Sequence, residues 1–132
     1  MTQETMTIRQ MCDAYDVTPR TLRFYETKEL LAPIRVGQKR LFTKRDRGRL
    51  TLILRGKRFG FSLEEIRQLL DLYDLGDNSY TQTTRAIELG RERHAALLKE
   101  RAQLDAAIEE LEAQLDANER TVATLKPARQ AS

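Results

Sequence analysis

The residue types that build disulfides and metal centres are nearly missing from this chain. Its 132 residues include one cysteine, Cys12, and one histidine, His94, and no tryptophan. A single cysteine excludes an intrachain disulfide, and the two residues together cannot supply the usual cysteine or histidine ligand sets. We therefore expect no metal and no cofactor. Cys12 falls on the buried stripe of a predicted helix, one turn from Ile8, and is expected to be a small core residue.

Long apolar segments and catalytic groupings are missing as well. No apolar run approaches the roughly 18 to 20 residues of a membrane span, and the polar residues 1–5 (MTQET) do not form the apolar part of a signal peptide. The sequence predicts a cytoplasmic protein without a membrane partner. It contains no nucleophile paired with a base, no phosphate-binding glycine loop and no pair of acids in an apolar setting, so we expect no enzyme and no catalytic residues.

Positive charge is concentrated in the N-terminal half of the chain. Residues 1–75 contain 15 lysines and arginines against 10 acids, whereas residues 76–132 contain 8 against 10. Within residues 35–58, ten basic residues accompany a single acid, Asp46. This distribution predicts a surface that faces a polyanion. On charge alone, a solvated basic face is the alternative.

The first 75 residues contain clear helix starts. Capping boxes begin at Thr7 and Ser62, a weaker one begins at Thr43, and Thr18 precedes a proline at the first helical position. These signals predict four short helices, over residues 7–15, 18–29, 43–57 and 62–74.

Two short connections organise these helices into a head. Residues 16–17 alone separate the first two helices, which is the tight junction of a helix-turn-helix. Two β-favouring runs flank Gly37 and Gln38 within residues 33–42, which predicts a small hairpin. We expect a mainly α fold with a head over residues 1–75 and a linker over residues 76–81.

From residue 82 onward the apolar pattern follows alternating steps of three and four. This spacing predicts the seam of a coiled coil over residues 82–126, ended by Pro127 and followed by a tail over residues 127–132. Such a helix would be roughly 65 Å long and could not bury its stripe on the head. We therefore expect a second copy of the chain as its partner. The predicted dimerisation residues are Ile87, Leu97, Leu104, Ile108, Leu111, Leu115, Val122 and Leu125.

Two polar residues fall on the same seam. His94 is expected to be packed or partly solvated in the coiled coil, because no second ligand residue lies near it. Asn118 is expected to set the register of the two helices.

The order and spacing of several motifs resemble the MerR family of bacterial transcription regulators. These motifs are the segment 17–26 (VTPRTLRFYE), Leu30 with Leu31 and Pro33, residues 39–42 (KRLF) and residues 60–66 (GFSLEEI). The resemblance implies a winged helix-turn-helix head that binds DNA, with the hairpin as its wing, and a homodimer built by a long antiparallel helix. It also implies an inverted-repeat site in a promoter, which the dimer bends and untwists so that RNA polymerase can act there.

The resemblance assigns DNA contacts residue by residue. Arg20, Thr21 and Arg23 would face the major groove, Phe24 and Tyr25 would lie at the DNA backbone, and Lys39 and Arg40 of the wing would contact phosphate or the minor groove. The family commonly has tyrosines where Phe24 and Phe42 stand, so those two positions lack a hydroxyl for a phosphate hydrogen bond.

The regulated signal is less well defined by the residues. Metal and redox sensors of the family carry cysteines near the end of the dimerisation helix, and multidrug sensors carry an added C-terminal domain, so neither class is expected. Residues 37–58 are similar to the LiuR-like subgroup, which is associated with branched-chain amino acid and acyl-CoA breakdown. A small-molecule effector is compatible with this sequence, but no residue pattern identifies it. The alternative function is a coiled-coil adaptor whose basic head docks on an acidic protein partner.

Overall fold

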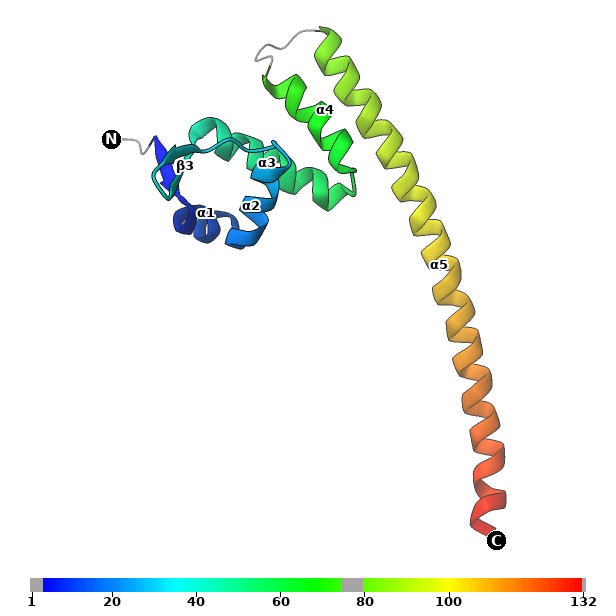
Figure 1. Ribbon diagram of the computed structural model, residues 1–132. Coiled ribbons are helices and arrows are strands. Elements are labelled where there is room, and N and C mark those ends of the chain that lie inside the picture. The colour runs from blue at the N-terminus through cyan, green and yellow to red at the C-terminus, as the bar shows by residue number, and fades with distance from the viewer. Residues whose placement is uncertain (1–3, 75–79, 132) are drawn as a thin grey trace. The chain divides into compact units, whose positions relative to one another are not determined.

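The computed structural model describes residues 4–74 and 80–131, and these form a mainly helical chain with a small antiparallel sheet (Figure 1). The chain consists of two compact units, residues 1–89 and 90–132. In chain order the elements are β1 (Thr5–Thr7), α1 (Ile8–Tyr15), α2 (Pro19–Thr27), β2 (Ile34–Val36), β3 (Lys39–Thr43), α3 (Lys44–Phe59), α4 (Leu63–Asp74) and α5 (Tyr80–Ala131).

The predicted helix starts are confirmed by their capping hydrogen bonds. The Thr7 hydroxyl accepts from the backbone N–H of Gln10 at 3.2 Å, and the Gln10 side chain accepts from the N–H of Thr7 at 2.8 Å. Thr43 with Asp46 and Ser62 with Glu65 make the same reciprocal pairs, and Thr18 caps α2. Each pair satisfies amide donors that the first turn of a helix leaves without a partner.

The helix-turn-helix forms as the short junction predicts. Asp16 adopts a left-handed conformation with φ of 54°, which ends α1 and redirects the chain within three residues into α2. Met11 and Leu22 are fully buried between the helices, and Ile8, Cys12 and Val17 pack against that core. Cys12, predicted to be a core residue, is only partly buried and lies at the edge of that core. Burial, together with the nearby Asp13, raises the pKa of its thiol.

The predicted hairpin is part of a three-stranded sheet. β2 and β3 pair antiparallel around Gly37, whose φ of 61° suits a residue without a side chain. The third strand, β1, was not predicted from the sequence; it pairs with the other edge of β3 and places Met6 opposite Phe42. Because β1 is only three residues long and its partner lies far along the chain, local periodicity could not reveal it.

The wing and the recognition helix pack against the same hydrophobic core in the head. Phe42 of β3 and Leu50 and Ile53 of α3 are buried with the helix-turn-helix residues. Two buried polar side chains bind the segment between α2 and the wing. Asp46 accepts from the backbone N–H of Ala32 at 3.0 Å, and Arg49 donates to the carbonyl of Leu30 at 2.7 Å. These hydrogen bonds offset the cost of burying the two charges.

The long helix differs from its prediction at both ends. α5 begins at Tyr80, within the predicted linker, and continues past Pro127 to Ala131. A proline removes one N–H donor and crowds the carbonyl four residues earlier, at a cost of about 3 kcal/mol, but its fixed φ is helical, so a helix can continue past it. The compact head also extends beyond residue 75, because Leu89 is buried and Arg85 donates to the Gln68 side chain at 3.1 Å. Of the predicted linker, residues 76–79 lie outside the described residues.

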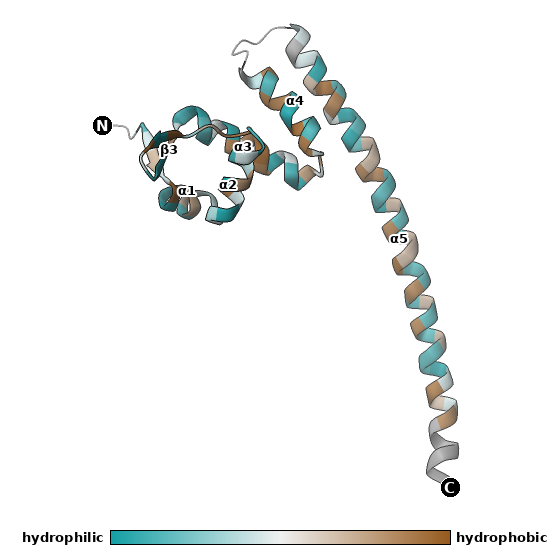
Figure 2. Cartoon of the chain, in the orientation of Figure 1, coloured by the Kyte–Doolittle hydropathy of each residue, from teal (hydrophilic) through white to brown (hydrophobic). Residues whose placement is uncertain are grey.

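Apolar residues recur between polar ones along the coloured part of α5 (Figure 2). Among the described residues, no helix has a stretch that is both long and apolar enough to cross a membrane.

Candidate nucleic-acid interface

The recognition helix α2 exposes most of the side chains that were predicted to meet DNA. Arg20 and Arg23 are exposed, and Thr21 is half-buried, with its hydroxyl hydrogen-bonded to that of Thr18 at 3.0 Å. The ring of Phe24 is 44% exposed, with the Lys28 ammonium 5.6 Å from its centroid. This face therefore combines positive charge with an apolar ring, a combination suited to a nucleic-acid backbone.

Tyr25, which was predicted to lie at the DNA backbone, is buried in the head. Only 4% of this residue is exposed, and its ring belongs to the core of the head together with Leu22. Burial raises the pKa of its phenol above the ordinary value. Phe24 and Tyr25 were predicted to lie together at the DNA backbone, but adjacent residues on a helix point about 100° apart, so the second ring packs inward while the first faces solvent.

The wing contributes two cations with different surroundings. Lys39 is exposed at the start of β3, whereas Arg40 is half-buried and donates from Nε to Oε1 of Glu26 at 2.6 Å. The other carboxylate oxygen, Oε2, accepts from Nε and Nη2 of Arg35 at 3.0 and 2.8 Å. Glu26 and Arg35 were not predicted to belong to the interface, because the spacing of residues 26, 35 and 40 gives no sign that they meet.

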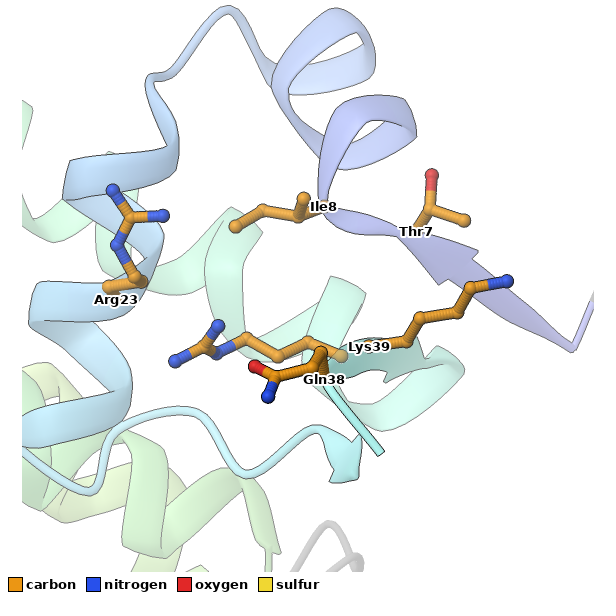
Figure 3. Close-up of a pocket in the computed structure, with 6 residues that line it drawn as sticks. Thr7, Ile8, Arg23, Gln38 and Lys39 are labelled. Carbon is orange, nitrogen blue, oxygen red and sulfur yellow. The ribbon is translucent and has the colours of Figure 1, made fainter. Parts of the chain in front are cut away.

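A hollow of about 270 Å³ lies between α2, the start of α1 and the wing. Figure 3 shows Arg23 on α2 and Gln38 at the hairpin turn on opposite sides of it. Arg23, Lys39 and Arg40 line a space large enough for a phosphate group, whose anionic oxygens guanidinium donors would stabilise. The Lys39 ammonium extends away from Arg23 (Figure 3). The lining residues are Thr7, Ile8, Arg23, Gln38, Lys39 and Arg40.

The predicted dimerisation residues are solvent-exposed on α5. Their exposed fractions range from 37% for Leu97 to 61% for Leu104. Asn118 also lies on this helix, and its side chain accepts from that of Gln114 at 3.0 Å. Each of the eight aliphatic side chains thus lies uncovered in the single chain.

The described residues contain no group of three or more potential metal-binding side chains. What the head does offer is a helix-turn-helix whose second helix presents arginines beside a basic hairpin. This architecture defines the protein as a winged helix-turn-helix DNA-binding protein.

Family comparisons agree with this class. The family model described as "MerR HTH family regulatory protein" matches residues 6–72, and the one described as "MerR, DNA binding" matches residues 47–125. The chain therefore belongs to the MerR family of transcriptional regulators.

Individual relatives resemble different portions of the chain. The regulator ZntR of Escherichia coli is 39% identical over 67 residues, which are 49% of this chain and 48% of ZntR. The chain thus matches about half the length of that curated relative. A MerR-family transcriptional regulator from Bacillus cereus is 30% identical with a TM-score of 0.62, covering 80% of this chain and 78% of its own. HiNmlR, a MerR-family regulator lacking the sensor domain and bound to promoter DNA in its structure, is 26% identical with a TM-score of 0.57, covering 73% and 74%.

Proposed function

We propose that this MerR-family regulator binds an inverted-repeat promoter site as a homodimer, with one head on each half-site. The observation that carries the proposal is the row of eight exposed aliphatic residues on α5, placed at coiled-coil spacing. Exposed leucines do not stabilise an isolated helix. Packing against a matching helix would bury this apolar surface and stabilise the pair by about 25 cal/mol per Å² of apolar surface removed from water. A second copy supplies that matching surface by symmetry.

Each head would dock through the two elements that border the hollow. α2 would lie in the major groove with Arg20 and Thr21 at base edges, while Arg23, Lys39 and Arg40 would neutralise phosphates. HiNmlR supports DNA binding by such a head because its structure contains promoter DNA. Two heads joined by one dimer would bend and untwist the spacer between the half-sites and so realign the elements that RNA polymerase reads.

A selection from random duplex DNA tests this function. The purified protein should enrich a motif with two inverted halves, and sedimentation should show two chains per duplex. An adaptor for an acidic protein would enrich no motif and would not bind DNA near physiological salt. Enrichment of a single, non-palindromic half by one chain would contradict the dimeric mode.

Transcription in vitro tests the partner. With RNA polymerase and a template containing the enriched motif, the protein should change the amount of transcript, and a template with one half scrambled should show no change. The small-molecule effector and the LiuR-like subgroup stay predictions that the same assay can address by adding acyl-CoA esters.

A further inference from the structure

One carboxylate joins the recognition helix to both strands of the wing. Glu26 lies on the last turn of α2, and its two oxygens accept from Arg35 on β2 and Arg40 on β3. These two arginines are direct partners in the β2–β3 ladder. Glu26 therefore binds one cross-strand pair of the hairpin, with one carboxylate oxygen for each strand.

β2 is bound to the rest of the head by its antiparallel ladder with β3, and its own side chains add little packing. All three residues of β2 are exposed, and the apolar Ile34 and Val36 are 50% and 55% exposed. Strands whose side chains make few packing contacts open easily, so ion pairs from the neighbouring helix help to hold the wing in one position. The Glu26 side chain is only 18% exposed, and bridges that are partly shielded from water are screened less than those on the open surface.

The carboxylate also remains charged in this setting. Burial alone would raise the pKa of Glu26, but the hydrogen bonds from Arg40 and Arg35, and the charges of those arginines, lower it below the ordinary value. A negative charge beside a surface that binds DNA weakens attraction to phosphate. Glu26 therefore opposes affinity for DNA, so a role in positioning accounts for it better than a contact with DNA.

We propose that Glu26 is a positioning residue that fixes the wing relative to the recognition helix before DNA binds. Glu26 binds Nε of Arg40 and so keeps this arginine at the hollow, which Arg23 also borders. Arg23 and Arg40 can therefore contact the DNA backbone of one half-site in a fixed relative position. The inference rests on the proposed function, because it concerns discrimination between a specific site and other DNA. Fixing the wing in advance reduces the conformational entropy that the protein loses on binding a specific site. Binding to other DNA does not require this geometry and gains nothing from it.

The test compares Glu26→Gln with Glu29→Gln. Both variants remove one negative charge close to the end of α2, but Glu29 is exposed and makes neither of the wing bridges. The probes are a duplex enriched by the wild-type protein from a random pool and a scrambled duplex of the same composition, each titrated at several salt concentrations. Both variants should bind the scrambled duplex as tightly as the wild type or more tightly, because each loses one negative charge.

Only Glu26→Gln should lose discrimination. We expect the ratio of affinities, enriched over scrambled, to fall about tenfold, the low end of what a lost hydrogen bond to a charged group costs. Arg35→Gln breaks the β2 half of the bridge from the other side and should lower the same ratio. A ratio that stays at the wild-type value in Glu26→Gln and Arg35→Gln overturns the inference, whereas a wild-type protein that enriches no duplex overturns the proposed function and the inference with it.

A measurement on the free protein separates positioning from folding. In nitrogen-15 spectra, the Nε–H protons of Arg35 and Arg40 should exchange slowly with water in the wild type and rapidly in Glu26→Gln. The exchange rates of the backbone amides of α1 and α3 should be the same in both proteins. Exchange at both arginines that is as slow in the variant as in the wild type overturns the inference.

Discussion

Arg20, Arg23 and Arg40 lie in three different surroundings, although all three are basic residues of one interface. Arg20 is exposed on the first turn of α2, Arg23 borders the hollow one turn later, and Arg40 is held by Glu26. An exposed side chain at the start of a recognition helix can reach base edges. Side chains that share a phosphate-sized hollow are placed for the backbone.

These surroundings predict different effects of alanine substitution. Arg23→Ala should weaken binding to every sequence alike and reduce the slope of log K against log salt by about one. Arg40→Ala should reduce the slope by a similar amount and, because it also breaks the bridge to Glu26, lower the ratio of affinities, enriched over scrambled, as Arg35→Gln should. Arg20→Ala should cost about 1 to 3 kcal/mol at the specific site and relax the preference at one base. Salt titrations and binding-site selections with each variant check this. An equal loss of sequence preference in all three variants would contradict the division.

Glu26 also predicts a pH dependence of stability. Its pKa is lower in the folded head than its ordinary value of 4.5, so the ion pairs contribute fully above that value and are lost as pH falls through the folded pKa. The free energy of unfolding of the wild type should therefore exceed that of Glu26→Gln at neutral pH, and the difference should shrink in acid. Urea unfolding of both proteins over a pH series measures it. A difference that is constant down to the acid unfolding of the head would show that the carboxylate is not stabilised by its arginines.

The packing of α3 against α4 depends on two glycines with unequal neighbours. A Cβ at Gly56 would lie 2.9 Å from Cγ1 of Ile66, which is buried in the core. At Gly48 the atoms in the way belong to the end of the Tyr73 side chain, which is 47% exposed and can turn aside. The neighbour of Gly56 is thus fixed in the core, whereas the neighbour of Gly48 is the end of a partly exposed side chain that can move.

Alanine at these two positions should have opposite effects. Gly56→Ala should destabilise the head by about 1 to 2 kcal/mol, because the strain of overpacking exceeds the gain in helix propensity. Gly48→Ala should be neutral or stabilise by up to about 1 kcal/mol, since the propensity gain is not opposed by a buried neighbour. Thermal unfolding of both variants checks this, and a stabilised Gly56→Ala would mean that α3 and α4 can separate without cost.

Elements with local signals were predictable from the sequence, and those made by distant contacts were not. Thr7, Thr43 and Ser62 each carry their capping partner three residues away, so the helix starts could be identified without knowledge of the fold. β1 exists only because β3 lies beside it, and Tyr25 is distinguished from Phe24 only by the core that the head builds around it. Glu26 meets its two arginines across the gap between a helix and a hairpin, which no local spacing encodes.

At the scale of the whole molecule, the seam on α5 underlies the proposed dimer, and its polar residues favour one register. An antiparallel pair with its two-fold axis near Ala106 places Leu104 opposite Ile108 and Leu97 opposite Leu115. The same register places His94 opposite Asn118, so these two polar side chains face each other. Facing an aliphatic side chain instead would cost each of them on the order of 1 to 3 kcal/mol.

Disulfide crosslinking in a Cys12→Ala background tests both the orientation and the register. A mixture of Leu97→Cys and Leu115→Cys protomers should form a disulfide between chains, because a bond requires Cβ atoms within about 4.5 Å and the proposed register brings these positions together. Leu97→Cys alone should not crosslink, since in an antiparallel pair its symmetry mate lies roughly 27 Å away along the helix, at 1.5 Å per residue. Efficient crosslinking of Leu97→Cys to itself would demonstrate a parallel coil. Crosslinking to a cysteine at Leu111 or Asn118 in place of Leu115 would keep the antiparallel orientation and move the axis. The spacing at which two heads can meet the two half-sites would change with it.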